Sequence, residues 1–179
     1  TGITIIRLYE RRPWSELIIK YKWPSIGREW CTREKINAVN RYVGSVGMYA
    51  VEYIGFSADE VHRTERPEIK KKKHPVRFPL IDHGITEKQA LKDCRELGYD
   101  WGGLYDIYKR VSCFCCPKKG HKGLRKLRTH RPELYAKVME MDKIIEQNGG
   151  FGTSMKTVHD WERTFQEEDR QMDLFKNAI

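Results

Sequence analysis

A chain of 179 residues is long enough for one domain with a sizeable core. Its composition, with 39% hydrophobic and 33% charged residues, argues against wholesale disorder. No apolar run is long enough to cross a bilayer and no signal peptide is visible, so we expect a soluble, cytoplasmic protein. The net charge of +9 favours polyanionic partners, or equally a solvated basic face.

The first half of the chain alternates predicted strands with predicted helices. Pro13 is a residue that often opens a helix, and short apolar runs of β-branched residues predict strands. In chain order we expect a strand over Ile3–Leu8, a helix after Pro13 and a second helix after Cys31-Thr32. The second helix should carry Ile36, Val39 and Val43 on one face. After it we expect a buried strand over Tyr49–Phe56, a basic loop over Val61–Phe78 and a short strand over Arg77–Ile81.

The second half reads as helical. Thr86–Gln89 is a capping box, and Gly98 is expected to stop the helix that it opens. Two helices should flank His130-Arg131-Pro132, and a last amphipathic helix should follow the break at 148–152. Alternation of strands and helices indicates an α/β fold, a parallel sheet with flanking helices plus C-terminal helices. We expect an α/β domain over 1–147, then a linker and C-terminal helix over 148–179.

Three of the five cysteines fall within the run Cys113–Cys116. An odd number with this clustering is not typical of a disulfide framework, and it favours a metal or cluster site. The C-x-x-C spacing lets Cys113 and Cys116 chelate one centre, with Cys115 and Cys31 as further candidates. Redox activity of a bare dithiol is a less favoured alternative. Cys94 lies on an apolar helix face, where a plain core residue explains it equally well.

Residues 107–131 contain no acidic residue but nine lysines and arginines. Cations three or four residues apart share a helix face, so this stretch is suited to contact substrate phosphate, tRNA or DNA. A solvated helix face would show the same pattern. The candidate polyanion-binding residues are Lys118, Lys119, Lys122, Arg125 and Arg128.

A second polar group follows the strand predicted over Tyr49–Phe56. Parallel sheets bind ligands beyond the carboxyl ends of their strands, and carboxylates there can hold Mg²⁺ or a ribose. A helix start stabilised by acidic residues is an equally good explanation. The candidate nucleotide-binding residues are Gly55, Ser57, Asp59, Glu60 and Arg63.

Several strings of the chain, taken in order, resemble one known family. They are Trp30-Cys31-Thr32-Arg33, then Tyr53–Glu60 with Arg63, Pro79–Glu87, Gly98–Tyr105 and Arg110–Pro117. From about Ile3 to Asp142 the chain resembles the phosphoadenosine phosphosulfate (PAPS) reductase family, in the reductase-like branch common in phage and mobile-element genomes. The joint order and spacing are more specific than any single string.

This resemblance implies an adenine-nucleotide α-hydrolase fold that takes ATP, adenylyl sulfate or PAPS. Related reductases hold a [4Fe-4S] cluster on a Cys-Cys pair and a distant C-x-x-C pair. The resemblance therefore implies Cys31, Cys113 and Cys116 as ligands, with zinc as the alternative to the cluster. Trp30 stands where the family has the first cysteine, so the fourth ligand is Cys115 or Cys94.

Two departures from the family change the expected activity. The phosphate-binding loop of the form S-G-G-x-D-S is absent, so the expected fold is incomplete at its N-terminus. No cysteine follows Cys116, so the catalytic cysteine of the reductases has no counterpart. We therefore expect sulfur transfer or ATP-dependent adenylation rather than thiosulfonate-forming reduction. The alternative is a zinc-stabilised nucleic-acid-binding module without catalysis. Expected partners are an adenine nucleotide, DNA or tRNA, and a second copy of the chain, with no membrane.

Overall fold

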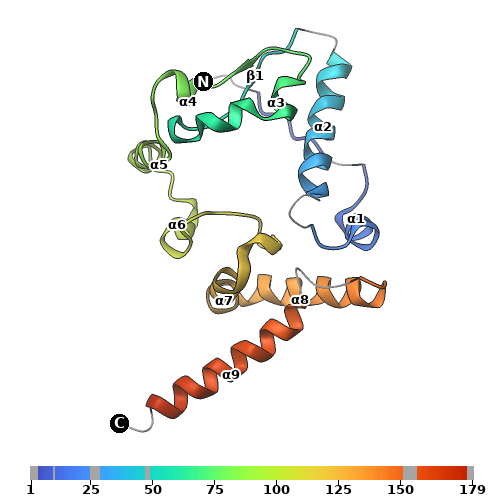
Figure 1. Cartoon of the computed structure of the whole chain (residues 1–179), viewed down its shortest axis with the longest axis vertical. Helices are drawn as coiled ribbons and strands as arrows, with labels where there is room; N and C mark the ends of the chain where they lie inside the picture. Colours follow the sequence, from blue (N-terminus) through green and yellow to red (C-terminus); the bar gives the residue numbers. More distant parts are fainter. Residues whose placement is uncertain (1–3, 10, 25–28, 47–48, 151–156, 177–179) are drawn as a thin grey trace. The chain divides into compact units, whose positions relative to one another are not determined.

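The computed structural model describes residues 4–9, 11–24, 29–46, 49–150 and 157–176. The chain divides into two compact units, and the elements of both are labelled in Figure 1. Unit 1 comprises residues 1–39 and 105–179, and unit 2 comprises residues 40–104. This division does not fall at residue 147, where the sequence analysis placed a boundary, because the last helix belongs to unit 1.

Unit 1 is helical. Its last three helices pack in sequence, with α7 against α8 and α8 against both α1 and α9. The expected helix after Pro13 and the two helices that flank residues 130–132 are confirmed. The elements are α1 (Trp14–Tyr21), the first part of α2 (Trp30–Val46), most of α6 (Leu104–Ile107), η3 (Pro117–Lys119), α7 (Gly120–His130), α8 (Pro132–Gln147) and α9 (Val158–Lys176).

A single hydrophobic cluster forms the core of unit 1. It joins α1, α7, α8 and α9, because each helix presents an apolar stripe of period 3.6 to its neighbours. The buried members are Ile18, Trp23, Leu124, Leu127, Tyr135, Val138, Ile145, Val158 and Phe165.

One carboxylate lies inside this apolar core. The Asp142 side chain is fully buried (0% exposed), and it accepts two hydrogen bonds. Trp23 Nε1 donates to Asp142 Oδ1 at 2.7 Å, and the backbone N–H of Val158 donates to Oδ2 at 2.6 Å. Asp142 therefore fastens both the residue that follows α1 and the first turn of α9 to the middle of α8.

The amphipathic pattern of α9 holds over its first half only. Val158 and Phe165 are fully buried, whereas Met172 and Phe175 at its far end are 48% and 74% exposed. The start of the helix is closed by a reciprocal pair: Thr157 N–H donates to Asp160 Oδ2 at 2.9 Å, and Asp160 N–H donates to Thr157 Oγ1 at 3.0 Å. These bonds satisfy backbone donors that a helix start otherwise leaves free.

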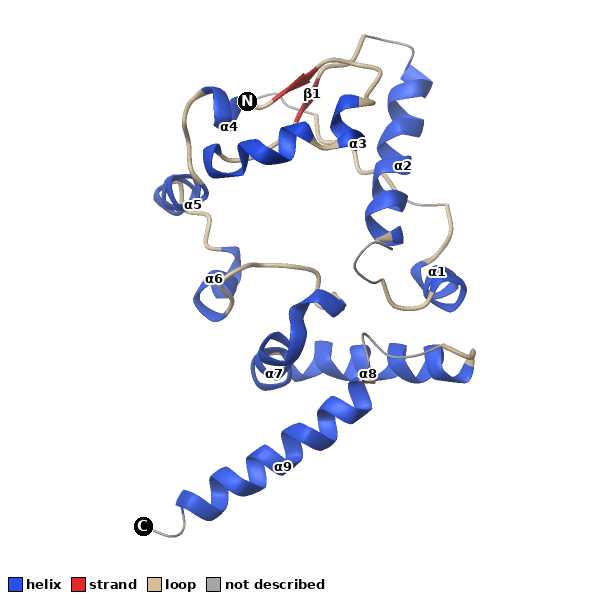
Figure 2. Ribbon diagram, viewed as in Figure 1, coloured by secondary structure: helices blue, strands red, loops and turns tan. Residues whose placement is uncertain are grey.

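Unit 2 consists of short elements. Besides the end of α2 it contains β1 (Glu52–Tyr53), η1 (Ala58–Glu65), α3 (Pro67–Lys70), β2 (Val76–Arg77), α4 (Pro79–Asp82), α5 (Glu87–Glu96) and η2 (Trp101–Gly103). β1 and β2, drawn in red in Figure 2, pair in parallel. Glu52 lies opposite Val76 and Tyr53 opposite Arg77. The parallel pairing agrees with an α/β class, but the described part of the chain is mostly helical and its sheet has two strands.

The expected strands are mostly wrong in extent. Of Tyr49–Phe56 only two residues pair, and Tyr53 is 70% exposed rather than buried. Residues 4–8 of the first predicted strand have no regular structure, residue 3 lies outside the described residues, and Ile5 is 84% exposed. The physical reason is common to both: an apolar run becomes a buried strand only where neighbouring strands or helices cover it.

Two further expectations need correction. The buried face of α2 carries Trp30, Glu34 and Ala38, not the predicted apolar side chains, of which Ile36 and Val39 are each 44% exposed. The basic stretch 61–78 is not one loop, since it contains the end of η1, α3 and β2. The predicted strand Arg77–Ile81 splits into the end of β2 and the start of α4.

The start of α5 follows the sequence closely. Thr86 is its N-cap, and Thr86 Oγ1 accepts a hydrogen bond from the backbone N–H of Gln89 at 3.2 Å, which confirms the N-cap half of the predicted capping box. The Gln89 side chain donates to Asp93 Oδ1 at 2.6 Å instead. Gly98 follows the helix in a left-handed conformation (φ +86°), which glycine adopts at low cost. No described helix is long and apolar enough to cross a bilayer.

Candidate functional site

Cys31 lies in the first turn of α2, next to a tryptophan that fixes the helix start. Trp30 is buried, its indole N–H donates to the Lys22 carbonyl at 3.0 Å, and its ring lies 4.8 Å from that of Trp14. Trp30 is thus an aromatic anchor of unit 1. It holds Cys31 at a fixed point of that unit.

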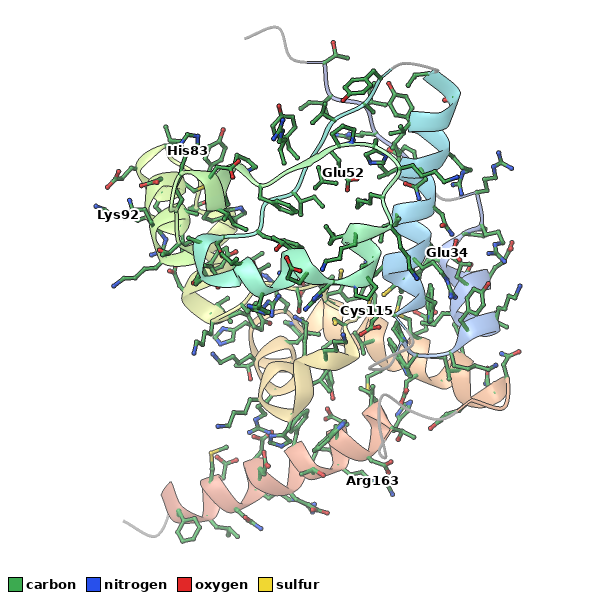
Figure 3. The ribbon with its side chains drawn as sticks, turned by 45° about the horizontal axis from the view of Figure 1, so that its top comes forward. Glu34, Glu52, His83, Lys92, Cys115 and Arg163 are labelled. Atoms are coloured by element: carbon green, nitrogen blue, oxygen red, sulfur yellow. The ribbon has the colours of Figure 1, made fainter. Side chains whose placement is uncertain are left out.

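The cysteine run lies in a turn that leads into η3. The backbone N–H of Cys116 donates to the Cys113 carbonyl at 3.0 Å, which closes the turn around the C-x-x-C pair. Phe114 and Cys115, inside this turn, pack against the core of unit 1. Figure 3 shows Cys115 on the segment that precedes α7. The core therefore sets the position of the turn.

The four thiols of unit 1 lie within electrostatic reach of one another. Burial, together with smaller contributions from negative charge on Cys113, Cys116 and Cys31, raises the pKa of the Cys115 thiol to about 11. Mutual repulsion among thiolates is the condition that a bound cation relieves, so the chemistry of this donor set fits a soft metal or an iron–sulfur cluster.

Two lysines supply positive charge beside the thiols. Lys35 Nζ donates to Cys113 Sγ at 3.8 Å. Burial lowers the pKa of the Lys119 ammonium, while the charges of Cys116, Cys113 and Cys115 oppose that change. Cations so placed stabilise thiolates, which are the forms that ligate metals.

The thiols of unit 1 do not form a chelating group in the described part of the chain. Among the described residues, no set of three or more His, Cys, Asp or Glu side chains is arranged to hold a metal ion. Sulfurs around one tetrahedral zinc lie about 3.8 Å apart, since each Zn–S bond is about 2.3 Å. The described side chains do not meet this condition as they stand. We refer to Cys31, Cys113, Cys115 and Cys116 as the cysteine centre.

Cys94, the alternative fourth ligand, belongs to the other unit. It lies half-buried on α5, and all five cysteines are free thiols. Cys115 shares unit 1 with the three ligands that the resemblance implies, so a four-thiol set exists there without Cys94.

The candidate nucleotide-binding residues come together in unit 2, at the start of η1. Arg63 Nη1 donates to Glu60 Oε1 at 2.6 Å, and buried Ser57 donates to Glu60 Oε2 at 3.4 Å. Burial alone would raise the pKa of Glu60, but the Arg63 guanidinium outweighs it and the pKa is lowered. Asp59 Oδ1 accepts from the backbone N–H of Glu87 at 3.2 Å, so it ties η1 to α5.

This loop offers a ligand one hydrogen-bond donor and one stretch of open backbone. Arg63 Nε is buried and has no hydrogen-bond partner among the described residues, and the guanidinium lies 4.1 Å from the centre of the Phe56 ring. At Gly55 an added Cβ would meet no atom within 4 Å, so the backbone there is open. The two carboxylates of the loop are already engaged, Glu60 by Arg63 and Ser57, and Asp59 by the backbone N–H of Glu87.

The basic residues of unit 1 separate into two groups. Arg125 and Arg128 of α7 pair with acidic residues of α9: Arg128 Nε donates to Glu162 Oε2 at 2.9 Å and Arg128 Nη1 to Asp169 Oδ2 at 2.7 Å, while Arg125 contacts Asp169 as well. These two candidates for polyanion binding therefore serve the packing of α7 on α9.

The other group lines a hollow of about 640 Å³ beside the cysteine centre. It contains the candidates Lys118, Lys119 and Lys122, and it adds residues that the sequence analysis did not select, namely Tyr108, Lys109, Arg110 and Lys126. The absence of acidic residues from 107–131 was the signal that pointed to them.

Comparison with protein-family models, curated proteins and solved structures finds no match to this chain.

Proposed function

We propose that this chain is a PAPS-reductase-like protein that acts on an adenine nucleotide in sulfur transfer or ATP-dependent adenylation. Its cysteine centre holds an iron–sulfur cluster. The observation that carries the proposal is the presence of Cys31, Cys113, Cys115 and Cys116 in one unit, where the charges of the other three thiols act on Cys115. Eighty-one residues separate Cys31 from Cys113, so this proximity is a product of folding.

The residues of unit 1 have separate tasks in this proposal. The four thiolates are the ligands, and Lys35 and Lys119 offset their negative charge. Phe114 packs on the core and holds the turn that carries the cysteine run. When bound, a cluster supplies a redox-active iron centre whose potential depends on nearby charge and solvent exposure.

The nucleotide is assigned to the start of η1 in unit 2. Arg63 offers the buried Nε–H to a phosphate or sulfate oxygen, and Gly55 leaves the backbone open to close approach. The reactions proposed for this site are activation of a nucleotide and transfer of sulfur.

Metal analysis of protein purified without oxygen tests the cysteine centre. We expect iron and sulfide with absorbance near about 400 nm, typical of such clusters. Cys31→Ser and Cys113→Ser should lose most of the iron, and Cys115→Ser should lose it if Cys115 is the fourth ligand. Cys94→Ser is the matched control and should retain it. Iron equal in all variants, or no metal at all, would overturn the proposal, and stoichiometric zinc would favour the non-catalytic zinc module.

Calorimetry with ATP and adenylyl sulfate tests the nucleotide site. We expect at least one to bind, and Arg63→Ala to weaken binding severalfold while Arg66→Ala, a nearby exposed arginine, leaves it unchanged. The absence of binding by both nucleotides contradicts this part of the proposal and leaves the metal result standing.

A further inference from the structure

The hollow beside the cysteine centre lies wholly within unit 1. It is formed by residues 108–112, Cys116, η3 and the first half of α7. Six lysines and arginines line it and no acidic residue does: Lys109, Arg110, Lys118, Lys119, Lys122 and Lys126. We call this surface the basic hollow.

Most of these charges are not neutralised. Lys118 pairs with Glu29 at 2.5 Å, but Lys119 donates to the Ser112 hydroxyl at 2.9 Å and Lys126 to the Ile107 carbonyl at 2.5 Å. Both of these acceptors are neutral, so neither lysine is paired with a carboxylate there. Lys109, Arg110 and Lys122 have no acidic partner within the described part of the chain, and all three are exposed.

A buried hydroxyl points to a ligand independently of the charges. Tyr108 lines the basic hollow and is only 8% exposed, yet its OH has no hydrogen-bond partner among the residues that the structure describes. A buried hydroxyl without a partner is unfavourable. An anionic oxygen in the hollow would accept this hydrogen bond.

We propose that the basic hollow binds the phosphodiester backbone of a nucleic acid. Five cations without an acidic partner exceed what one phosphate group, with about two negative charges, can balance. Four of them are lysines, whose flexible ammonium groups act as point charges rather than as the fixed forks that arginine offers to a single anion. Such a surface suits successive phosphates of one strand. This inference goes beyond the proposed function and does not require a metal in the cysteine centre.

Cys116 lines the hollow as well as the cysteine centre. A strand bound there would therefore pass directly beside the thiols of unit 1. The two sites share Cys116 and Lys119, but Arg110 and Lys122 line the hollow alone, so substitution of these two residues tests the hollow separately.

Fluorescence anisotropy with a labelled single-stranded DNA and an RNA of the same sequence tests the inference. Arg110→Gln/Lys122→Gln is compared with Lys71→Gln/Lys73→Gln, which removes the same charge from exposed lysines of unit 2. Each phosphate contact contributes about −0.7 to the slope of log K against log salt, so the hollow variant should bind about 10- to 30-fold more weakly at 0.1 M salt, with a slope about 1.4 smaller. The two strands show whether the 2′-hydroxyl matters.

Three outcomes would overturn the proposal: no binding of either strand, equal weakening in both double variants, or complete displacement of the strand by inorganic pyrophosphate at equal concentration. The last would identify a small-anion site instead. Iron measured in the same samples keeps the inference distinct from the proposed function, because loss of strand binding with the metal retained contradicts the inference alone.

Discussion

All the buried hydrophobic side chains that the structure describes lie in unit 1. Among the described residues of unit 2, only Ser57 is buried. Unit 2 is joined by polar and aromatic contacts instead. Phe56 stacks on Phe78 with ring centres 5.8 Å apart, and Ala58 N–H donates to the Ile85 carbonyl at 2.8 Å. Hydrophobic burial is the larger source of folding free energy, so the two units should differ in stability.

The same difference bears on the two candidate sites. The turn that carries the cysteine run packs directly on the core of unit 1, through Phe114 and Cys115. The loop that carries Glu60 and Arg63 rests on hydrogen bonds and ion pairs at a partly exposed surface. We therefore expect the cysteine centre to be the more rigid of the two.

The largest expected effect comes from emptying the core of unit 1. Phe165→Ala removes a fully buried ring, and it should lower the free energy of unfolding by about 3–5 kcal/mol. Phe78→Ala in unit 2 removes one partner of a half-exposed ring pair and should cost only about 1 kcal/mol. Urea unfolding followed by tryptophan fluorescence measures both. Phe175→Ala, on the exposed end of α9, is the control, and a loss there as large as that of Phe165→Ala would break the comparison.

A second test concerns the buried carboxylate of unit 1. Asp142→Ala leaves the Trp23 indole N–H and the Val158 backbone N–H without acceptors, and it should cost about 2–4 kcal/mol. Asp142→Asn keeps one acceptor oxygen and should lose less. The measurement is thermal unfolding, with hydrogen exchange at the start of α9 as the local readout. Equal Tm values for wild type and Asp142→Ala would show that the carboxylate does not hold α9.

The smallest expected effect is a pH dependence of unit 2. Burial would raise the pKa of Glu52, but hydrogen bonds from Lys72 at 2.6 Å and His74 at 2.7 Å outweigh it and lower the pKa. Because the pKa is depressed in the folded state, this stabilisation is present above the ordinary value of 4.5 and is lost as the pH falls through the folded value. It amounts to at most about 1 kcal/mol, since the group is partly exposed.

Hydrogen exchange of β1 and β2 between pH 6 and pH 3.5, corrected for the intrinsic rate, follows this loss. Glu52→Gln should remove the pH dependence and leave exchange in α8 unchanged. A pH dependence that persists in Glu52→Gln would assign it to another group.

Sequence reasoning succeeded where the signal is local. The capping box at Thr86 depends on a side chain and a backbone N–H three residues away, and the helices on either side of residue 131 depend on Pro132 and on apolar spacing. Thr157 and Asp160 form a cap that is reciprocal, and their spacing of three residues is the local signal for it. All of these are decided within about one helical turn.

The charges of α7 show what spacing alone does not decide. Arg125 and Lys122 lie on the same helix and within the same acid-free stretch, and the sequence assigned both to a polyanion. Arg125 instead faces Asp169 of α9, 44 residues further along, while Lys122 lines the basic hollow. Only the packing of α9 against this part of unit 1 distinguishes them.

The sequence by itself determined the helices, the cysteine spacing and the basic stretch, because each depends on neighbours along the chain. Tertiary structure decided which apolar runs become buried: Val158 and Phe165 are covered, whereas Ile5 and Tyr53 are not. It also brought Cys31 into the unit of Cys113, Cys115 and Cys116, although 81 residues lie between Cys31 and Cys113. Burial and long-range proximity depend on which surfaces meet, and that is a property of the folded chain as a whole.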